Sequence, residues 1–232
     1  MYPRHPWPAQ FTRGELFRGW VFFALYLTVF PALMGTVQRF SMEELPVAET
    51  NVVYYLLCAV MAFLVFWTFL RKGFDLLLDR LPENLFAFAV GLAAAVGLWF
   101  LIRLIPLPVI NPNTMSYPEQ FALSPAATVV ILVVLMPMVE EVLFRGMLFG
   151  NARRYSRVFA YVLAVPVYAV YCVWQFVYAY GVIDWWYLLL AIQYLPMSLA
   201  LCWCYERSES IWSAIFLHMA INGVMLYTSL AV

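Results

Sequence analysis

Long apolar stretches alternate with short polar connections along the whole chain. A helix needs about 20 mostly apolar residues to cross the hydrocarbon core of a bilayer. Seven stretches meet this requirement, and prolines inside the fifth and sixth are expected to kink them. The pattern therefore predicts an all-α, polytopic transmembrane helix bundle with about seven spans: Phe17–Val37, Val52–Leu70, Phe86–Ile105, Ala126–Gly150, Val158–Tyr180, Trp185–Tyr205 and Ile211–Leu230.

The connections between these stretches are short and differ in character. Arg71–Asn84 carries mixed charge around an apolar run, and we expect an interfacial helix there. The segment Pro106–Ser124 contains four prolines and is expected to be irregular. Ser124 and Pro125 then form a good helix start, with serine as the N-cap and proline in the first turn.

Composition agrees with a membrane protein. Hydrophobic residues make up 66% of the 232 residues and charged residues only 11%, against about half and a quarter in ordinary soluble domains. A chain this short cannot bury so much apolar surface in one water-soluble core. Because the net charge is zero, no basic field favours nucleic acid. We expect the lipid bilayer as a partner and no nucleic-acid partner.

The basic residues predict the orientation, because cytoplasmic loops carry an excess of Lys and Arg. With the N-terminus inside, ten of the 13 basic residues fall inside and two outside. Arg145 lies within a span. We therefore expect an integral membrane protein with a cytoplasmic N-terminus, in a bacterial plasma membrane. The inside residues are Arg4, Arg13, Arg18, Arg71, Lys72, Arg80, Arg153, Arg154, Arg157 and Arg207, and the outside residues are Arg39 and Arg103.

All four cysteines fall inside apolar runs. They are Cys58, Cys172, Cys202 and Cys204. Cysteine behaves as a small apolar residue in such surroundings. We expect neither a disulfide framework nor a zinc site built on cysteine.

Two adjacent glutamates, Glu140 and Glu141, lie well inside an apolar run. A carboxylate at the centre of a bilayer costs roughly 2.5–3.5 kcal/mol on insertion scales, so it indicates a function. Glu141 and Arg145 are four residues apart and can pair on one helix face. Glu140 points about 100° away and is left free to act as a general base. The alternative is a structural polar cluster that holds helices together.

One of the two histidines also lies inside a span. His218 and Asn222 are four residues apart in the last apolar stretch and project from the same helix face. His5 lies in the N-terminal tail and is expected to be solvated. His218 with Asn222, in a chain that already carries an intramembrane glutamate pair, favours a functional site over a packing role.

These residues resemble a known family. Glu140 to Gly146 is similar to the EExxxR motif of the CPBP (CAAX protease and bacteriocin-processing, Abi) family of intramembrane glutamic-type endopeptidases. Ser210 to Asn222 resembles the family's last motif, HxxxN. The resemblance divides the chain into residues 1–125, whose spans carry no signature, and residues 126–232, which form the CPBP-like core.

A third family motif, FxxxH, is altered here. The matching stretch runs from Tyr171 to Gln175, so tyrosine stands for the aromatic residue and glutamine for the histidine. A glutamine amide can hold a water or donate to an oxyanion, but it cannot exchange protons. A zinc site needs three or four good ligands, and only Glu140 and His218 qualify. We therefore expect no cofactor and no metal.

The resemblance implies a peptidase that opens to the cytoplasmic side and cuts near the C-terminus of a membrane-associated or lipidated protein or peptide, using a Glu-activated water. The catalytic candidates are Glu140, His218, Asn222 and Gln175, with Glu141, Arg145 and Tyr171 in supporting roles. One alternative is a catalytically impaired scaffold on the same fold, because Gln175 replaces the motif histidine. A transporter or proton relay that uses Glu140 is a third interpretation, although the chain lacks the internal repeats typical of transporters.

Overall fold

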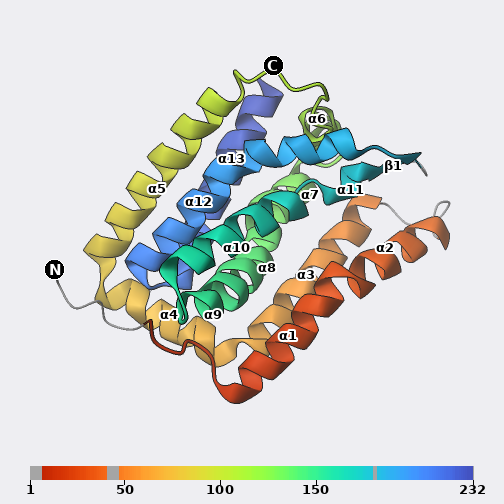
Figure 1. Cartoon of the computed structure of the whole chain (residues 1–232). Coiled ribbons are helices and arrows are strands. Elements are labelled where there is room, and N and C mark those ends of the chain that lie inside the picture. The colour runs from red at the N-terminus through yellow and green to blue at the C-terminus, as the bar shows by residue number, and fades with distance from the viewer. Residues whose placement is uncertain (1–6, 41–46, 180–181, 232) are drawn as a thin grey trace.

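The structure is a computed structural model that describes residues 7–40, 47–179 and 182–231, with the backbone alone at residues 38–40, 47 and 179. Its long helices run side by side along a common direction and form one bundle (Figure 1). Helices α8, α10, α12 and α13 occupy the middle, α5 covers one side, and α1 to α3 cover the other. His5 and Arg4 lie outside the described residues.

Helices account for nearly all of the regular structure, and the predicted all-α fold class is confirmed. Besides helices, the described residues contain a single two-stranded antiparallel hairpin in which Tyr178 pairs with Ile183. The elements are α1 (Arg13–Leu27), α2 (Val29–Phe40), α3 (Val47–Val65), α4 (Trp67–Asp79), α5 (Leu81–Ile102), α6 (Asn113–Leu123), α7 (Pro125–Val129), η1 (Val130–Leu135), α8 (Met136–Glu140), η2 (Glu141–Phe149), α9 (Gly150–Arg153), α10 (Arg157–Tyr171), α11 (Trp174–Val177), β1 (Tyr178–Ala179), β2 (Val182–Ile183), η3 (Trp185–Leu190), α12 (Ala191–Ser208) and α13 (Ile211–Leu230).

Five helical segments among the described residues are long and apolar enough to cross a membrane. A sixth is possible if α1 and α2, which meet at a 41° bend around Thr28, form one span. The prediction of about seven spans is therefore not confirmed. The five segments are Ala48–Val65, Leu81–Ile102, Pro125–Arg153, Trp185–Ser208 and Ile211–Leu230.

The predicted fifth span, Val158–Tyr180, is wrong as a continuous helix. Helix α10 has 15 residues and ends at Tyr171. A non-helical backbone at Val173 (φ −125°) separates it from the single turn of α11, and the chain then enters the β-hairpin. Hydropathy reports how a segment partitions into lipid, but an apolar run alone does not say where helical hydrogen bonding stops.

The segment Pro106–Ser124 also differs from expectation, because it contains helix α6 with Pro118 inside it. Ser124 is the N-cap residue of α7 and Pro125 opens that helix, as predicted. The Ser124 side chain makes no capping hydrogen bond. Its backbone carbonyl instead accepts from the Thr128 hydroxyl at 2.9 Å.

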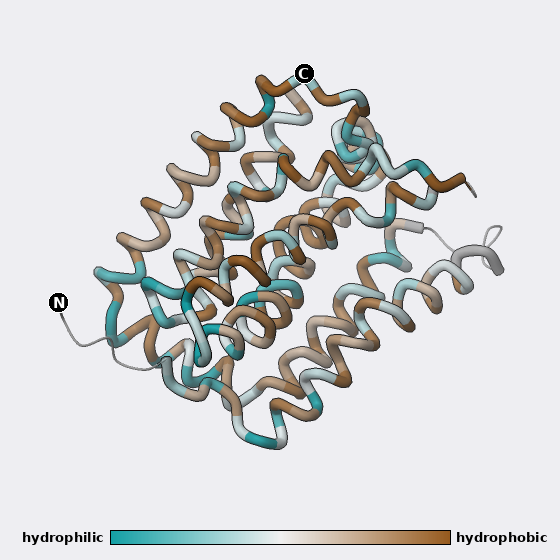
Figure 2. The backbone as a smooth tube through the Cα atoms, viewed as in Figure 1, coloured by the Kyte–Doolittle hydropathy of each residue, from teal (hydrophilic) through white to brown (hydrophobic). Residues whose placement is uncertain are grey.

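The connections with most of the basic residues gather at one end of the bundle, here called the basic end. It comprises α4, the turn between α9 and α10, and the turn between α12 and α13, which appear as teal segments near the N-terminus in Figure 2. Ion pairs join these connections: Arg80 contacts Glu209 at 3.0 Å, and Arg153 contacts Glu206 at 2.6 Å. The helix expected within Arg71–Asn84 is found as the C-terminal part of α4, followed directly by α5.

The helices of residues 1–125 do not pack apart from the rest of the chain. Phe22 and Phe23 of α1 and Phe66 belong to the same buried core as Phe144 and Met147 of η2. Gly19 permits this contact, because a Cβ atom there would lie 2.6 Å from the Phe66 ring. Small residues allow such close helix approach in membrane proteins.

Candidate active site

The glutamate pair lies in a span that switches from α-helical to π-helical geometry twice. The continuous segment Pro125–Arg153 includes two π-helical stretches, η1 and η2. Glu140 is the last residue of α8, and Glu141 is the first residue of η2. The π-helix is rare and often marks functional sites. The two carboxylates leave this junction in different directions and meet different partners.

Glu141 is paired with Arg145, as the four-residue spacing predicted. Arg145 Nη1 donates to Glu141 Oε1 at 3.0 Å, and both side chains are at most 1% exposed. Arg145 also donates to the Ser198 hydroxyl at 3.3 Å and lies 4.0 Å from the centre of the Tyr168 ring. The buried cation is therefore neutralised and held from three directions.

Glu141 has a second partner that the sequence did not indicate. His218 Nδ1 lies 2.7 Å from Glu141 Oε1. A carboxylate paired with arginine only accepts hydrogen bonds, so Nδ1 carries the proton. This bond fixes the imidazole ring. Its Nε2 atom then faces the Tyr168 hydroxyl at 3.4 Å and Glu140 Oε2 at 4.0 Å.

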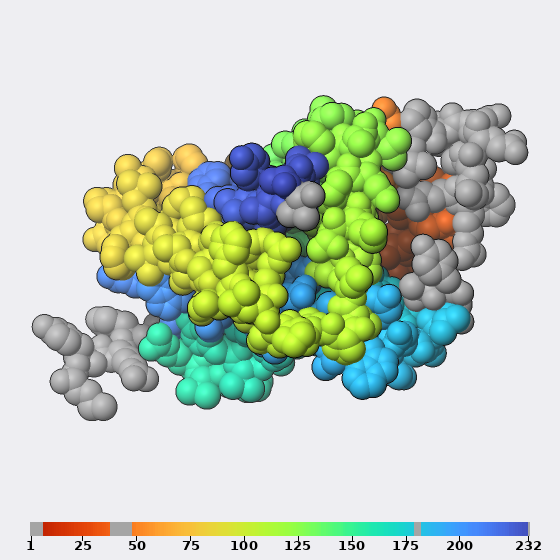
Figure 3. Space-filling model, turned by 90° about the horizontal axis from the view of Figure 1, so that it is seen from above, coloured from red at the N-terminus to blue at the C-terminus, as the bar shows by residue number. Residues whose placement is uncertain are grey.

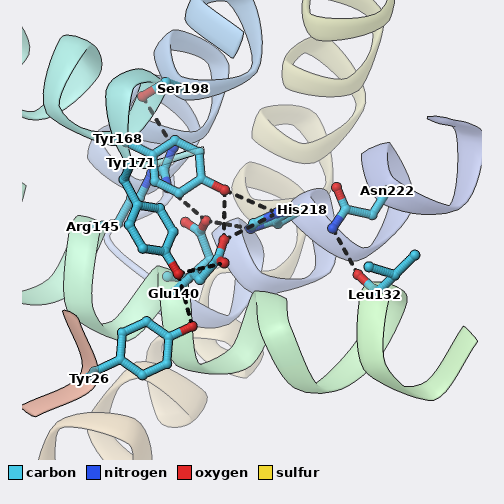
Figure 4. Close-up of polar contacts among 10 residues, drawn as sticks. Tyr26, Leu132, Glu140, Arg145, Tyr168, Tyr171, Ser198, His218 and Asn222 are labelled. Atoms are coloured by element: carbon cyan, nitrogen blue, oxygen red, sulfur yellow. Dashed lines mark hydrogen bonds and ion pairs between the residues drawn. The ribbon is translucent and has the colours of Figure 1, made fainter. Parts of the chain in front are cut away.

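Glu140 is surrounded by tyrosine hydroxyls rather than by a cation. It is 3% exposed. Tyr168 donates to its Oε2 atom at 2.8 Å, and Tyr171 donates to Oε1 at 3.3 Å. Tyr171 in turn contacts Tyr26 of α1 at 3.1 Å, oxygen to oxygen. Figure 4 shows the three rings converging on this carboxylate from one side and His218 from the other.

Asn222 holds the backbone of the same span. Its Nδ2 atom donates to the Leu132 carbonyl at 2.8 Å, within the π-helical stretch η1 (Figure 4). His218 and Asn222 therefore contact opposite ends of the segment 132–141. This fixes α13 against the helix that carries both glutamates.

Gln175 is the predicted site residue that the structure does not bring to the glutamates. It lies in α11, beyond the break that follows Tyr171, and its side chain is exposed. Among the described residues, the hydrogen bonds to Glu140 come from Tyr168 and Tyr171. Tyr168 was missed by the sequence reasoning. The available signal was its spacing of three residues from Tyr171, which places both hydroxyls on one helix face.

A cavity of about 480 Å³ leads to this cluster. Glu140, Tyr168 and His218 lie among its buried lining residues, and Pro31, Gln120 and Gln175 among its exposed ones. Tyrosines and side-chain amides, Asn222 among them, supply most of the polar groups in the lining. The cavity therefore connects the exposed residues Pro31, Gln120 and Gln175 with an enclosed carboxylate.

The donor set does not fit a metal ion. Within the described ranges, no group of three or more His, Cys, Asp or Glu side chains is arranged to hold one. Glu141 is engaged by Arg145 and by His218 Nδ1. The four cysteines are free thiols.

The comparisons with known proteins identify the part of the chain that carries this cluster. Residues 122–224 match the family described as type II CAAX prenyl endopeptidase Rce1-like. No curated protein and no solved structure was found to match. The matched range includes both glutamates, Arg145, Tyr168, His218 and Asn222. The resemblance carried by the EExxxR and HxxxN motifs is thereby confirmed: residues 122–224 match the Rce1-like CAAX endopeptidase model of the CPBP membrane-protease family.

Proposed function

We propose that the protein is an intramembrane endopeptidase in which Glu140 activates the attacking water. The observation that carries this proposal is the separation of the two glutamates. Glu141 neutralises Arg145 at 3.0 Å, whereas Glu140 accepts hydrogen bonds from tyrosines and forms no ion pair with a Lys or Arg of the described residues. A general base must be free to take a proton and must lie where substrate can reach it, and Glu140 lines the cavity.

The reaction is peptide hydrolysis. Glu140 takes a proton from a water molecule, and the hydroxide that forms attacks the scissile carbonyl carbon. Negative charge develops on the carbonyl oxygen, and the Tyr168 hydroxyl is placed to donate to it. When the C–N bond breaks, the proton held by Glu140 passes to the leaving amine. One water is consumed, and one new carboxyl and one new amine are formed.

His218 positions the reacting groups. Its Nδ1 proton is held by Glu141, so Nε2 faces Glu140 and Tyr168 as an acceptor. A water between Nε2 and Glu140 Oε2, which are 4.0 Å apart, can donate one hydrogen to each atom. Glu141, Arg145 and Asn222 support this geometry. The substrate in this proposal is a membrane-associated or lipidated protein or peptide, cut near its C-terminus.

The competing proposal is a catalytically impaired scaffold on the same fold. Its specific support is Gln175, which stands at the histidine position of the FxxxH alignment and lies outside the Glu140 cluster. In that case the buried polar groups hold helices together. Glu140 would then be exchangeable for another hydrogen-bond acceptor without loss of the cellular role.

The test compares wild type with Glu140→Gln in lipid vesicles that contain candidate membrane-anchored peptides, with products identified by mass spectrometry. Glutamine keeps the shape and the acceptor oxygen but cannot take a proton. Loss of a general base typically costs about 10²–10⁴ in rate. The matched control is Glu83→Gln, the same chemical change on the exposed surface of α5. Persistent cleavage by Glu140→Gln contradicts the proposed role. An inert wild type, together with a cellular role that survives Glu140→Ala, supports the scaffold.

A further inference from the structure

The cavity occupies one half of the bundle along the common helix direction. Helix α1 runs away from the basic end and α3 runs back toward it, and they contribute Tyr26 and Asn51, near their far ends. Helix α10 contributes Tyr171, its last residue, and α12 contributes Tyr194 from its first turns. Met225 lies in the C-terminal half of α13. Each of these helices reaches the cavity with the part distant from the basic end.

The exposed lining residues lie farther still from the basic end. Gln120 belongs to α6, the helix between α5 and α7 at the end opposite α4 and α9 (Figure 1). Gln175 belongs to α11, which leads into the hairpin at the same end. Seen from above, α6 lies beside the C-terminal part of α13 (Figure 3). The described lining includes no residue of α4, α9 or the turn between α12 and α13.

The distribution of basic residues indicates which side of the membrane each end of the bundle faces. Ten of the 13 Lys and Arg residues fall in the segments that the sequence assigns to the cytoplasm, and the described ones lie at or near the basic end. Cytoplasmic connections carry such an excess because basic loops resist translocation. If the basic end faces the cytoplasm, the cavity opens on the other side of the membrane. The family resemblance led us to expect an opening toward the cytoplasm, so the geometry points the opposite way.

The chemistry of the lining narrows the class of substrate. Glu140 is the single carboxylate among the described lining residues, and neither Lys nor Arg occurs among them. A negatively charged segment would find no cation to compensate for its loss of water. Tyrosine hydroxyls and the amides of the exposed residues Gln120 and Gln175 can bind uncharged backbone and side chains.

We propose that the cavity receives its substrate from the non-cytoplasmic side, as an exported or membrane-anchored peptide segment without acidic groups near the reacting bond. Cleavage of this peptide segment rests on the endopeptidase function proposed above. The direction of access does not depend on cleavage and can be measured by itself.

The experiment uses a membrane-impermeant maleimide on intact cells and on inverted membrane vesicles. The background is Cys172→Ala, because Cys172 lines the cavity whereas the other three cysteines are buried. Gln120→Cys and Gln175→Cys report on the cavity. Tyr155→Cys, at a side chain that is 86% exposed in the turn between α9 and α10, reports on the basic end.

We expect both cavity cysteines to react in intact cells and Tyr155→Cys to react only in inverted vesicles. Labelling of Tyr155→Cys in intact cells would reverse the orientation and overturn the proposal. Labelling of both cavity cysteines only in inverted vesicles would overturn it as well. Wild type, with its native Cys172, is a second probe of the cavity that needs no folding test. Labelling requires no catalysis, so an inert wild type or persistent cleavage by Glu140→Gln leaves this result unaffected. The two proposals therefore fail separately.

Discussion

Replacing Glu141 with alanine is expected to destabilise the folded protein strongly. Glu141 Oε1 accepts from Arg145 at 3.0 Å and contacts His218 Nδ1 at 2.7 Å, and its side chain is fully buried. The substitution leaves the Arg145 guanidinium enclosed without a carboxylate. Breaking a buried ion pair by removing one partner costs about 3–5 kcal/mol in soluble proteins.

The contacts that remain around Arg145 do not offset this loss. The Ser198 hydroxyl at 3.3 Å and the Tyr168 ring at 4.0 Å are present both before and after the substitution. A cation–π contact is worth only about 0.5–2 kcal/mol. Native proteins are typically stable by about 5–15 kcal/mol, so a loss of 3–5 kcal/mol removes a large share of that stability.

The assay is denaturant unfolding of the purified protein in detergent–lipid micelles, with the folded yield from membranes as a second measurement. Glu140→Gln is the matched comparison, because it changes the neighbouring carboxylate but keeps an acceptor for Tyr168. We expect it to cost no more than one net hydrogen bond, about 0.5–1.5 kcal/mol. The double variant Glu141→Leu with Arg145→Met removes both charges and is expected to recover most of the stability lost in Glu141→Ala.

Two results would refute this reasoning. If Glu141→Ala unfolds at the wild-type denaturant concentration, the ion pair does not stabilise the bundle. If Glu140→Gln misfolds while Glu141→Ala is folded and inactive, the structural and catalytic roles of the two glutamates are reversed.

Three further predictions concern the chemistry of the site. Tyr168→Phe keeps the ring over Arg145 but removes the hydroxyl, so the cleavage rate should fall by about 10²–10³ without a change in folded yield. A rate loss of less than tenfold, about 1.4 kcal/mol of barrier, contradicts a donor role. Gln175→His should change the rate by less than about tenfold, because position 175 lies beyond the break after Tyr171; a large gain in cleavage would show that this position governs catalysis. Elemental analysis of purified protein should find far less than one zinc per chain, and stoichiometric zinc that disappears in His218→Ala would contradict the metal-free mechanism.

The sequence by itself determined the features that depend on local spacing and on composition. The apolar stretches identified a helical membrane protein, because a continuous apolar run of about 20 residues spans lipid as a helix, whereas the strands of a closed β-barrel are shorter and alternate in polarity. The spacing of Glu141 and Arg145 predicted their ion pair, because residues four apart meet on a helix wherever that helix is placed. The EExxxR and HxxxN motifs likewise pointed to the family, which the match over residues 122–224 confirmed.

The tertiary structure alone decided which distant residues meet. His218 and Glu141 are 77 positions apart, and Tyr168 and Glu140 are 28 apart. Hydropathy did not reveal that α10 stops at Tyr171, and this break is what separates Gln175 from the glutamates. The direction in which the cavity opens is also a property of the assembled bundle. These features depend on how helices pack against one another, and packing is set by side-chain shapes across the interfaces rather than by the period of any single segment.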